Sequence, residues 1–191
     1  MSTTSVRTRK HATALLLAGS LVTLAGCSDS SSDSDASPSK SPTRTAGSSS
    51  PGSSAGTEDT AVIAAYISSW DAQTEAYSKA SSAGTDLKKT TTLRALFDVE
   101  HDLSVMQKAG QVTTGKPVLN PKVIKVTTDK IATATVTDCV DTTHWILTDK
   151  ASMKPVPLPT TRLVKYVSTA TLEKWGTKWM VTKLSAQEQA C

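Results

Sequence analysis

One carboxylate is better placed for acid–base chemistry than the others. Asp138 lies in an alternating stretch and is the only acid on the face that also carries Ala132, Ala134 and Val136. Strand residues two apart share a face, so we expect this face to turn toward the interior. Burial raises the pKa of a carboxyl, which suits proton transfer near neutral pH. Asp138 could instead cap a turn or pair with a Lys or Arg, and the sequence leaves these interpretations open.

Histidines and sequence signatures offer less chemistry. Beyond the N-terminal segment only His101 and His144 remain. Glu100, His101 and Asp102 are consecutive, and adjacent helical residues point in different directions, which indicates a solvated helix face. The sequence has no Gly-x-Ser-x-Gly, no phosphate-binding loop and no His-Glu-x-x-His. We therefore expect no cofactor and no metal.

Aromatic side chains are the other means of holding a ligand. Trp70 is expected in the core, and at least one of Trp175 and Trp179 should face the helices. Trp145 stands before a Pro-rich segment and is the best candidate for an exposed aromatic. Tyr66, Trp70 and Trp145 are the candidate ligand-binding residues, with burial in the core as the competing interpretation for each.

The N-terminal segment has the features of an export signal. Basic residues without an acid precede a mostly apolar run at 12–24, which is too short to span a bilayer comfortably. Residues 24–27, Leu-Ala-Gly-Cys, resemble the lipobox of bacterial lipoproteins, in which a diacylglycerol is attached to the Cys thiol. The resemblance implies lipidation at Cys27 and a protein anchored to the extracytoplasmic face of the cell membrane. An ordinary secretory signal is the alternative.

Composition divides the chain into three parts. Residues 1–26 form the signal, and 27–56 comprise the lipidated Cys and a tether with thirteen Ser among residues 28–56. This tether cannot bury enough apolar surface to fold, so we expect it to be disordered. Residues 57–191 have the length of one ordinary domain.

Charge is divided unevenly within the predicted domain. Residues 57–102 contain four basic and eight acidic side chains, whereas 103–191 contain twelve basic and six acidic ones. A basic sheet face could meet an anionic cell-wall polymer, lipid headgroups or an envelope protein, and ordinary solvated surface is the alternative. Because three of the basic residues lie in the signal, the basic balance of the whole chain is no argument for nucleic acid.

Helical periodicity gives way to strand periodicity along this domain. Thr57 is the expected N-cap of a first helix that ends near 81–84. A second helical stretch at 86–109 should be interrupted near 90–92 and should stop at Gly110. Its apolar positions are Leu93, Leu96, Val99, Leu103 and Met106. Strands are predicted at 111–119, 122–127, 131–139, 162–175 and 178–185, with a hairpin at Gly176 and with 144–147 as an extension of the sheet. Helices followed by an antiparallel sheet make an α+β fold.

This order of elements resembles the nuclear-transport-factor-two-like, or ketosteroid-isomerase-like, cone fold, in which N-terminal helices cover a strongly curved sheet. The resemblance rests on the first helix with Tyr66 and Trp70, on Gly-Lys-Pro-Val at 115–118, on Val-x-Asp-Cys-x-Asp at 136–141, and on 172–181. Such proteins include isomerases, dehydratases and non-enzymatic binding modules. The isomerases place an acid or His inside the cone, which makes Asp138 the candidate catalytic residue. We favour the binding module over a small isomerase or lyase.

Two cysteines remain if Cys27 carries lipid. Cys139 and Cys191 are then an even pair in an exported chain, and a disulfide would pin the C-terminal tail to the sheet. Two free thiols are the alternative. A metal site is not expected, because two Cys without nearby His offer too few ligands.

The inner face of the sheet decides between the two functions. Strand alternation predicts that it is closed by Tyr66, Trp70 and Leu103 and lined by Ala132, Ala134, Val136, Val164 and Tyr166. We expect the space above the small alanines to be mostly filled by the large side chains of the first helix. An open apolar cavity that holds Asp138 would instead favour the enzyme.

Overall fold

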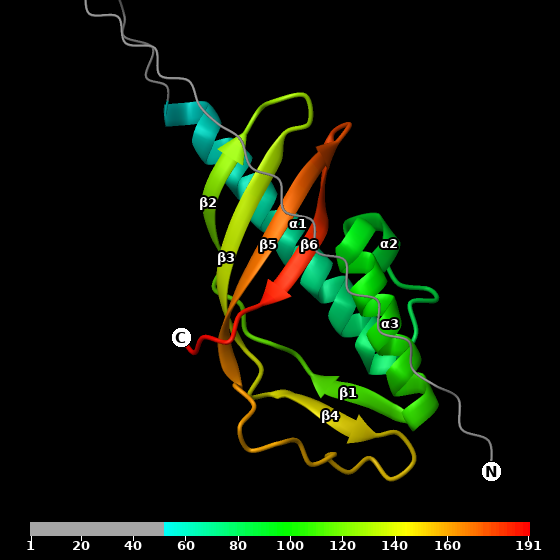
Figure 1. The fold of residues 1–191 in the computed structure, drawn as a ribbon. Coiled ribbons are helices and arrows are strands. Elements are labelled where there is room, and N and C mark those ends of the chain that lie inside the picture. Colours follow the sequence, from blue (N-terminus) through cyan, green and yellow to red (C-terminus); the bar gives the residue numbers. More distant parts are fainter. Residues whose placement is uncertain (1–51) are drawn as a thin grey trace, which may run out of the picture. The chain divides into compact units, whose positions relative to one another are not determined.

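The computed structural model describes residues 52–191. Three helices come first: α1 (Gly52–Lys79), α2 (Leu87–Thr90) and α3 (Leu93–Ala109). Six strands follow: β1 (Gln111–Gly115), β2 (Lys122–Thr127), β3 (Thr133–Asp141), β4 (Trp145–Asp149), β5 (Lys165–Trp175) and β6 (Lys178–Ala186). The N-terminal helices pack against antiparallel sheets, which confirms the predicted α+β fold (Figure 1). Cys27, the predicted signal and most of the tether lie outside the described residues.

The strands form two sheets rather than one. The larger has the order β2-β3-β5-β6, and β5 and β6 meet in the hairpin predicted at Gly176. The prediction that residues 144–147 extend this sheet is wrong, because β4 pairs with β1 in a separate ribbon. Gly115 has a φ of 74° opposite Trp145, and a side chain there would collide with the backbone of His144. The close approach of β1 and β4 at this point therefore requires glycine.

The helices follow the predicted pattern, including the break near 90–92, and differ from it in an earlier start of α1 and an exposed first residue of α3. The break between α2 and α3 occurs at Thr91 and Thr92, and Thr92 N–H donates to Val181 O on β6. The chain leaves the helix there because its backbone is tied to the sheet. The helix α1 begins at Gly52, five residues before the predicted cap at Thr57, since extending a nucleated helix requires little further free energy. Leu93, the first residue of α3, is 56% exposed.

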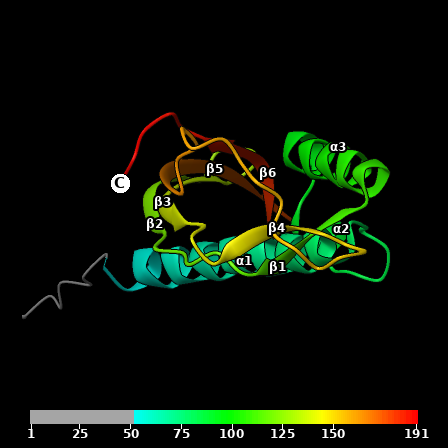
Figure 2. The same cartoon turned by 90° about the horizontal axis from the view of Figure 1, so that it is seen from below.

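The main core lies between α1 and the inner face of the larger sheet. Val62, Tyr66 and Trp70 follow one face of α1 and pack with Ala134, Val136 and Leu172, while Ala132 and Tyr166 are partly buried against this cluster. Burial of each large side chain stabilises the fold by about 2 kcal/mol. Figure 1 shows α1 crossing behind this sheet, with α3 beside β6, and Figure 2 shows the same elements from below.

Two residues predicted for this core lie elsewhere. Leu103 belongs to a second cluster with Ala76, Leu87 and Val99, because α3 packs on α1 and β6 rather than over β3. Val164 is 47% exposed, since it precedes β5 and its carbonyl oxygen instead accepts hydrogen bonds from Thr142.

The predicted disulfide is present. Cys139 and Cys191 are bonded with a Cα–Cα distance of 5.9 Å, within the usual range. Before it reaches Cys139, the tail exchanges two backbone hydrogen bonds with Val167 of β5, through Gln187 N–H and Gln189 O. The bridge therefore pins the tail to the sheet, as predicted. Within the described part of the chain, no helix is long and apolar enough to cross a membrane.

Candidate ligand-binding site

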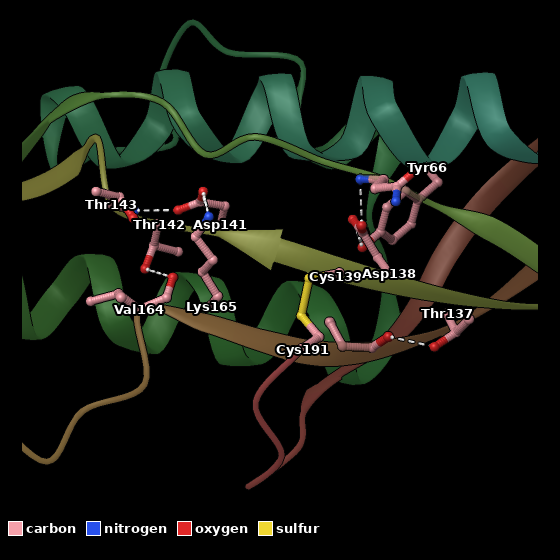
Figure 3. The surroundings of a disulfide bond; sticks show 12 residues. Tyr66, Thr137, Asp138, Cys139, Asp141, Thr142, Thr143, Val164, Lys165 and Cys191 are labelled. Atoms are coloured by element: carbon pink, nitrogen blue, oxygen red, sulfur yellow. Dashed lines mark hydrogen bonds and ion pairs between the residues drawn. A yellow bond between two sulfur atoms is a disulfide. The ribbon is translucent and has the colours of Figure 1, made fainter.

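Asp138 is enclosed between α1 and the sheet. Alternation along β3 turns it inward with Ala134, Val136 and Val140, and it is only 2% exposed. The Tyr66 hydroxyl donates to its Oδ2 at 3.0 Å, and the Asn120 N–H donates to its Oδ1 at 2.6 Å. Figure 3 shows Asp138 pointing toward Tyr66 while its neighbour Cys139 points the opposite way, toward Cys191. The inward orientation predicted from the sequence is confirmed.

The electrostatics of this pair follow from its burial. Burial raises the pKa of Asp138, and the hydrogen bonds from Asn120 and Tyr66 oppose part of that rise. Burial and the nearby Asp138 charge raise the pKa of Tyr66 well above its usual value. Both carboxyl oxygens therefore have partners, and Tyr66, which is 1% exposed, covers one of them. The arrangement ties α1 to β3 and to the loop before β2.

The space above the inner face of β3 is filled as predicted, because Tyr66 and Trp70 pack there with Ala134 and Val136. A hollow of about 240 Å³ remains beside this core, between α1, α3, β4 and the ends of β5 and β6. We call it the aromatic pocket. Asp138 and Tyr66 do not line it. Its lining residues are Trp70, Gln73, Tyr77, Ala95, Asp98, Val99, Asp102, Trp145, Tyr166, Ser168, Leu184 and Ala186.

Three aromatic rings form steep walls around this pocket. Trp145 meets Trp70 at 5.9 Å between ring centroids with an interplanar angle of 73°, and it meets Tyr77 at 5.4 Å with an angle of 82°. The Trp145 Nε1–H donates to Thr113 Oγ1 at 3.0 Å, which fixes the ring in place. Trp145 is thus partly buried, and the prediction that it is an exposed aromatic is wrong. Tertiary packing of the β1–β4 ribbon against α1 turns its ring inward.

The exposed tryptophan is instead Trp175, which is 44% exposed on the β5–β6 hairpin. Trp179, which pairs with Lys174 across the hairpin, is buried in the main core, as predicted for at least one of the two. Trp70 is buried as well, and among the described residues its Nε1 is the buried side-chain polar atom that has no hydrogen-bond partner. A buried donor of this kind is uncommon in folded proteins.

Two carboxylates stand at the edge of the pocket. Asp98 and Asp102 lie one turn apart on α3, so they share a face. The Tyr77 hydroxyl donates to Asp102 Oδ2 at 3.0 Å, and Arg94 pairs with Asp98 at 2.8 Å. Burial, followed by the Asp102 charge, raises the pKa of Tyr77 well above its usual value. Among the described residues, Asp102 has no basic partner within salt-bridge distance.

Two further hollows adjoin the aromatic pocket. One, also about 240 Å³, shares Tyr77, Asp102 and Trp145 with it and adds Arg162 and Leu158. The other, about 550 Å³, lies between the loop before β5 and the C-terminal tail and shares Tyr166 and Ala186. Burial raises the pKa of Tyr166, and the nearby Arg162 charge opposes the rise. The aromatic pocket therefore shares part of its lining with each of these two hollows.

Other candidate residues from the sequence lie away from these hollows. His101 is exposed and stacks on Phe97 on the outer face of α3, and His144 is exposed before β4. The described residues contain no group of three or more His, Cys, Asp or Glu side chains that could hold a metal ion.

Sequence reasoning placed Tyr166 on the inner face but missed Tyr77 as a pocket residue, and it interpreted Asp102 as part of a solvated helix face. One signal could have found Tyr77. It lies eleven residues after Tyr66, about three helical turns, so both tyrosines project from the same face of α1.

Comparison with known proteins adds a likeness in structure, not in sequence family. No model of a known protein family matches the chain, and no curated protein matches it. The fold is similar to the crystal structure of the intermembrane space region of the chloroplast protein ARC6, with a TM-score of 0.50 and 14% sequence identity. The likeness covers 70% of this chain and 97% of that one. At this identity it shows a shared α+β fold and nothing about the ligand.

Proposed function

We propose that the protein is a lipid-anchored, extracytoplasmic binding module of the cone-fold family that holds a small molecule in the aromatic pocket. The observation that carries the proposal is the meeting of Trp70, Tyr77 and Trp145 with two carboxylates around one hollow. Ligand sites typically combine apolar walls with a few polar groups. At about 240 Å³ the pocket suits a small molecule rather than a polymer chain.

The location rests on two separate features. A disulfide between Cys139 and Cys191 is typical of oxidising compartments outside the cytosol. The lipobox at residues 24–27 supplies the anchor in this proposal. Mass spectrometry of the mature N-terminus should find a diacylglycerol on Cys27, and Cys27→Ser should release the protein from the membrane fraction. An unmodified Cys27 in exported protein would contradict the anchor but not the pocket.

Binding itself can be tested without knowing the ligand. Ligand-observed NMR with a library of small polar and aromatic fragments should give hits that Trp145→Ala removes. Trp175→Ala is the matched control, because that tryptophan is exposed on the hairpin and does not line the pocket. Hits that survive in both variants, or no hits at all, would contradict the proposed pocket function.

A small isomerase or lyase that uses Asp138 is the second candidate. The raised pKa of this buried carboxyl favours it, because a general acid or base needs such tuning. Against it, Asp138 lies outside the lining of the pocket, and both of its oxygens accept protein hydrogen bonds. A catalytic base must reach the proton that it abstracts, so the geometry favours the binding module.

The partners of the outer surface stay a prediction. The membrane is the proposed partner of the lipid anchor, and an anionic cell-wall polymer or an envelope protein is the proposed partner of the basic sheet face. Nucleic acid is not proposed.

A further inference from the structure

The chemistry of the pocket walls narrows the class of ligand, an inference that rests on the proposed binding function. Trp70, Trp145 and Tyr77 are not stacked in one plane: their interplanar angles of 73° and 82° make a corner of steep walls. Rings set at steep angles can turn more than one π-face toward one compact group, and the face of a ring, not its edge, carries the negative side of the quadrupole.

The charged side chains that line the pocket itself are acidic. Asp98 and Asp102 line it and no Lys or Arg does, although Arg162 lines both adjoining hollows. Arg94 already pairs with Asp98, whereas Asp102 receives only the Tyr77 hydroxyl among its described contacts. That hydrogen bond holds the Asp102 carboxylate at the edge of the aromatic walls without neutralising it.

We infer that the aromatic pocket binds a compact organic cation, such as a methylated ammonium group, with Trp70, Trp145 and Tyr77 around the cation and Asp102 as its counter-charge. Aromatic faces attract cations through the ring quadrupole, and this attraction is stronger where water is excluded. The partly buried walls and the unpaired carboxylate are complementary to such a group in both shape and charge.

The test is isothermal titration calorimetry on the full chain in non-ionic detergent with three probes. Choline and tetramethylammonium carry the cation, and 3,3-dimethyl-1-butanol is the neutral isostere of choline. We expect choline to bind at least tenfold more tightly than the isostere. Trp145→Ala and the near-isosteric Asp102→Asn should each weaken choline binding at least fivefold. If Trp145→Ala proves poorly folded, Trp145→Phe replaces it. Because this variant keeps an aromatic ring, it should weaken choline binding less than the loss of the ring would.

Two matched controls lie far from the pocket. Asp129→Asn changes an acid in the β2–β3 turn, and Trp175→Ala changes the exposed ring of the β5–β6 hairpin. Both turns lie at the end of the sheet opposite the β1–β4 ribbon (Figure 1), so choline affinity should not change.

Failure of this inference is distinguishable from failure of the binding function. Two outcomes would overturn the inference that the ligand is a cation and leave a pocket for neutral ligands. One is equal affinity for choline and its isostere. The other is no choline binding alongside fragment hits that Trp145→Ala removes. Choline affinity that Trp145→Ala and Asp102→Asn both leave unchanged would overturn the cation site. The absence of both choline binding and pocket-dependent fragment hits would overturn both proposals.

Discussion

The molecule contains the same contact twice, in two different settings. Tyr66 donates to Asp138, and Tyr77 donates to Asp102, each at 3.0 Å. The two tyrosines are on one face of α1, about three turns and roughly 16 Å apart. The first pair lies under the larger sheet and is sealed, whereas the second stands at the aromatic pocket.

The difference shows that position within the fold, rather than the contact itself, decides what a Tyr–Asp pair does. Asp138 comes from a strand in the middle of the sheet, so its environment is closed on every side, and a second donor from Asn120 completes its hydrogen bonds. Asp102 comes from α3, at the edge of a hollow, and its charge remains available. We expect the first pair to contribute stability and the second to contribute binding.

The largest expected effect concerns the disulfide beside the sealed pair. Cys191→Ser should lower the free energy of unfolding by about 4 kcal/mol, because the bridge closes a loop that spans 52 residues of sequence. Urea denaturation under oxidising conditions measures the loss. Reduced wild-type protein should match the variant, and a loss below about 1 kcal/mol would mean that the tail is held mainly by its contacts with β5.

Removal of Asp138 and removal of Asp102 should lower the stability of the fold by clearly different amounts. Asp138→Ala leaves the buried Tyr66 hydroxyl and the Asn120 N–H without a partner, so we expect a loss of about 2–3 kcal/mol. Asp102→Ala removes a contact at an exposed site and should cost less than about 1 kcal/mol. Chemical denaturation of both variants tests this. Equal losses would remove the distinction between the sealed and the accessible pair.

The pH dependence of stability should report on the sealed pair. The folded-state pKa of Asp138 is raised, so the folded protein binds its proton more tightly than the unfolded chain does. The contribution of protonated Asp138 to the free energy of unfolding is therefore present at low pH. It is lost as the pH rises from the usual carboxyl pKa through the raised one, and the free energy of unfolding falls by at most about 1.4 kcal/mol per pH unit.

Comparison with Asp138→Asn isolates this contribution. Asp141, whose pKa Lys165 holds well below its usual range, acts in the opposite direction in both proteins, so its effect cancels in the difference. The stability of wild type relative to Asp138→Asn should fall as the pH rises through this window. A difference that rises instead would show that the Asp138 carboxylate is stabilised in the folded state.

The smallest effect comes from removing the two hydroxyls. Tyr66→Phe should cost about 1 kcal/mol, because Asp138 then keeps only the Asn120 N–H among its observed donors. Tyr77→Phe should cost about 0.5 kcal/mol, since water can replace the lost donor at Asp102. Thermal unfolding of the two variants side by side measures the contrast. The reverse order would place the sealed environment around Tyr77.

Local patterns in the sequence determined much of the framework. Strand alternation placed Asp138 on the inner face of β3, and Gly110, with a φ of 64°, ends α3 as expected for a left-handed cap. The hairpin at Gly176, the break before α3 and the pairing of Cys139 with Cys191 were also predictable. Each of these depends on neighbouring residues or, for the disulfide, on the small number of cysteines.

Only the tertiary structure decided where the pocket lies. Tyr77 and Asp102 come from different helices, and Trp145 comes from a ribbon that sequence periodicity assigned to the main sheet. Their meeting depends on how α1, α3 and β1–β4 pack, and periodicity specifies which face of an element is apolar but not which partner covers it. The same limit explains why Leu103 packs in a separate cluster and why the ring of Trp145 is turned inward rather than exposed.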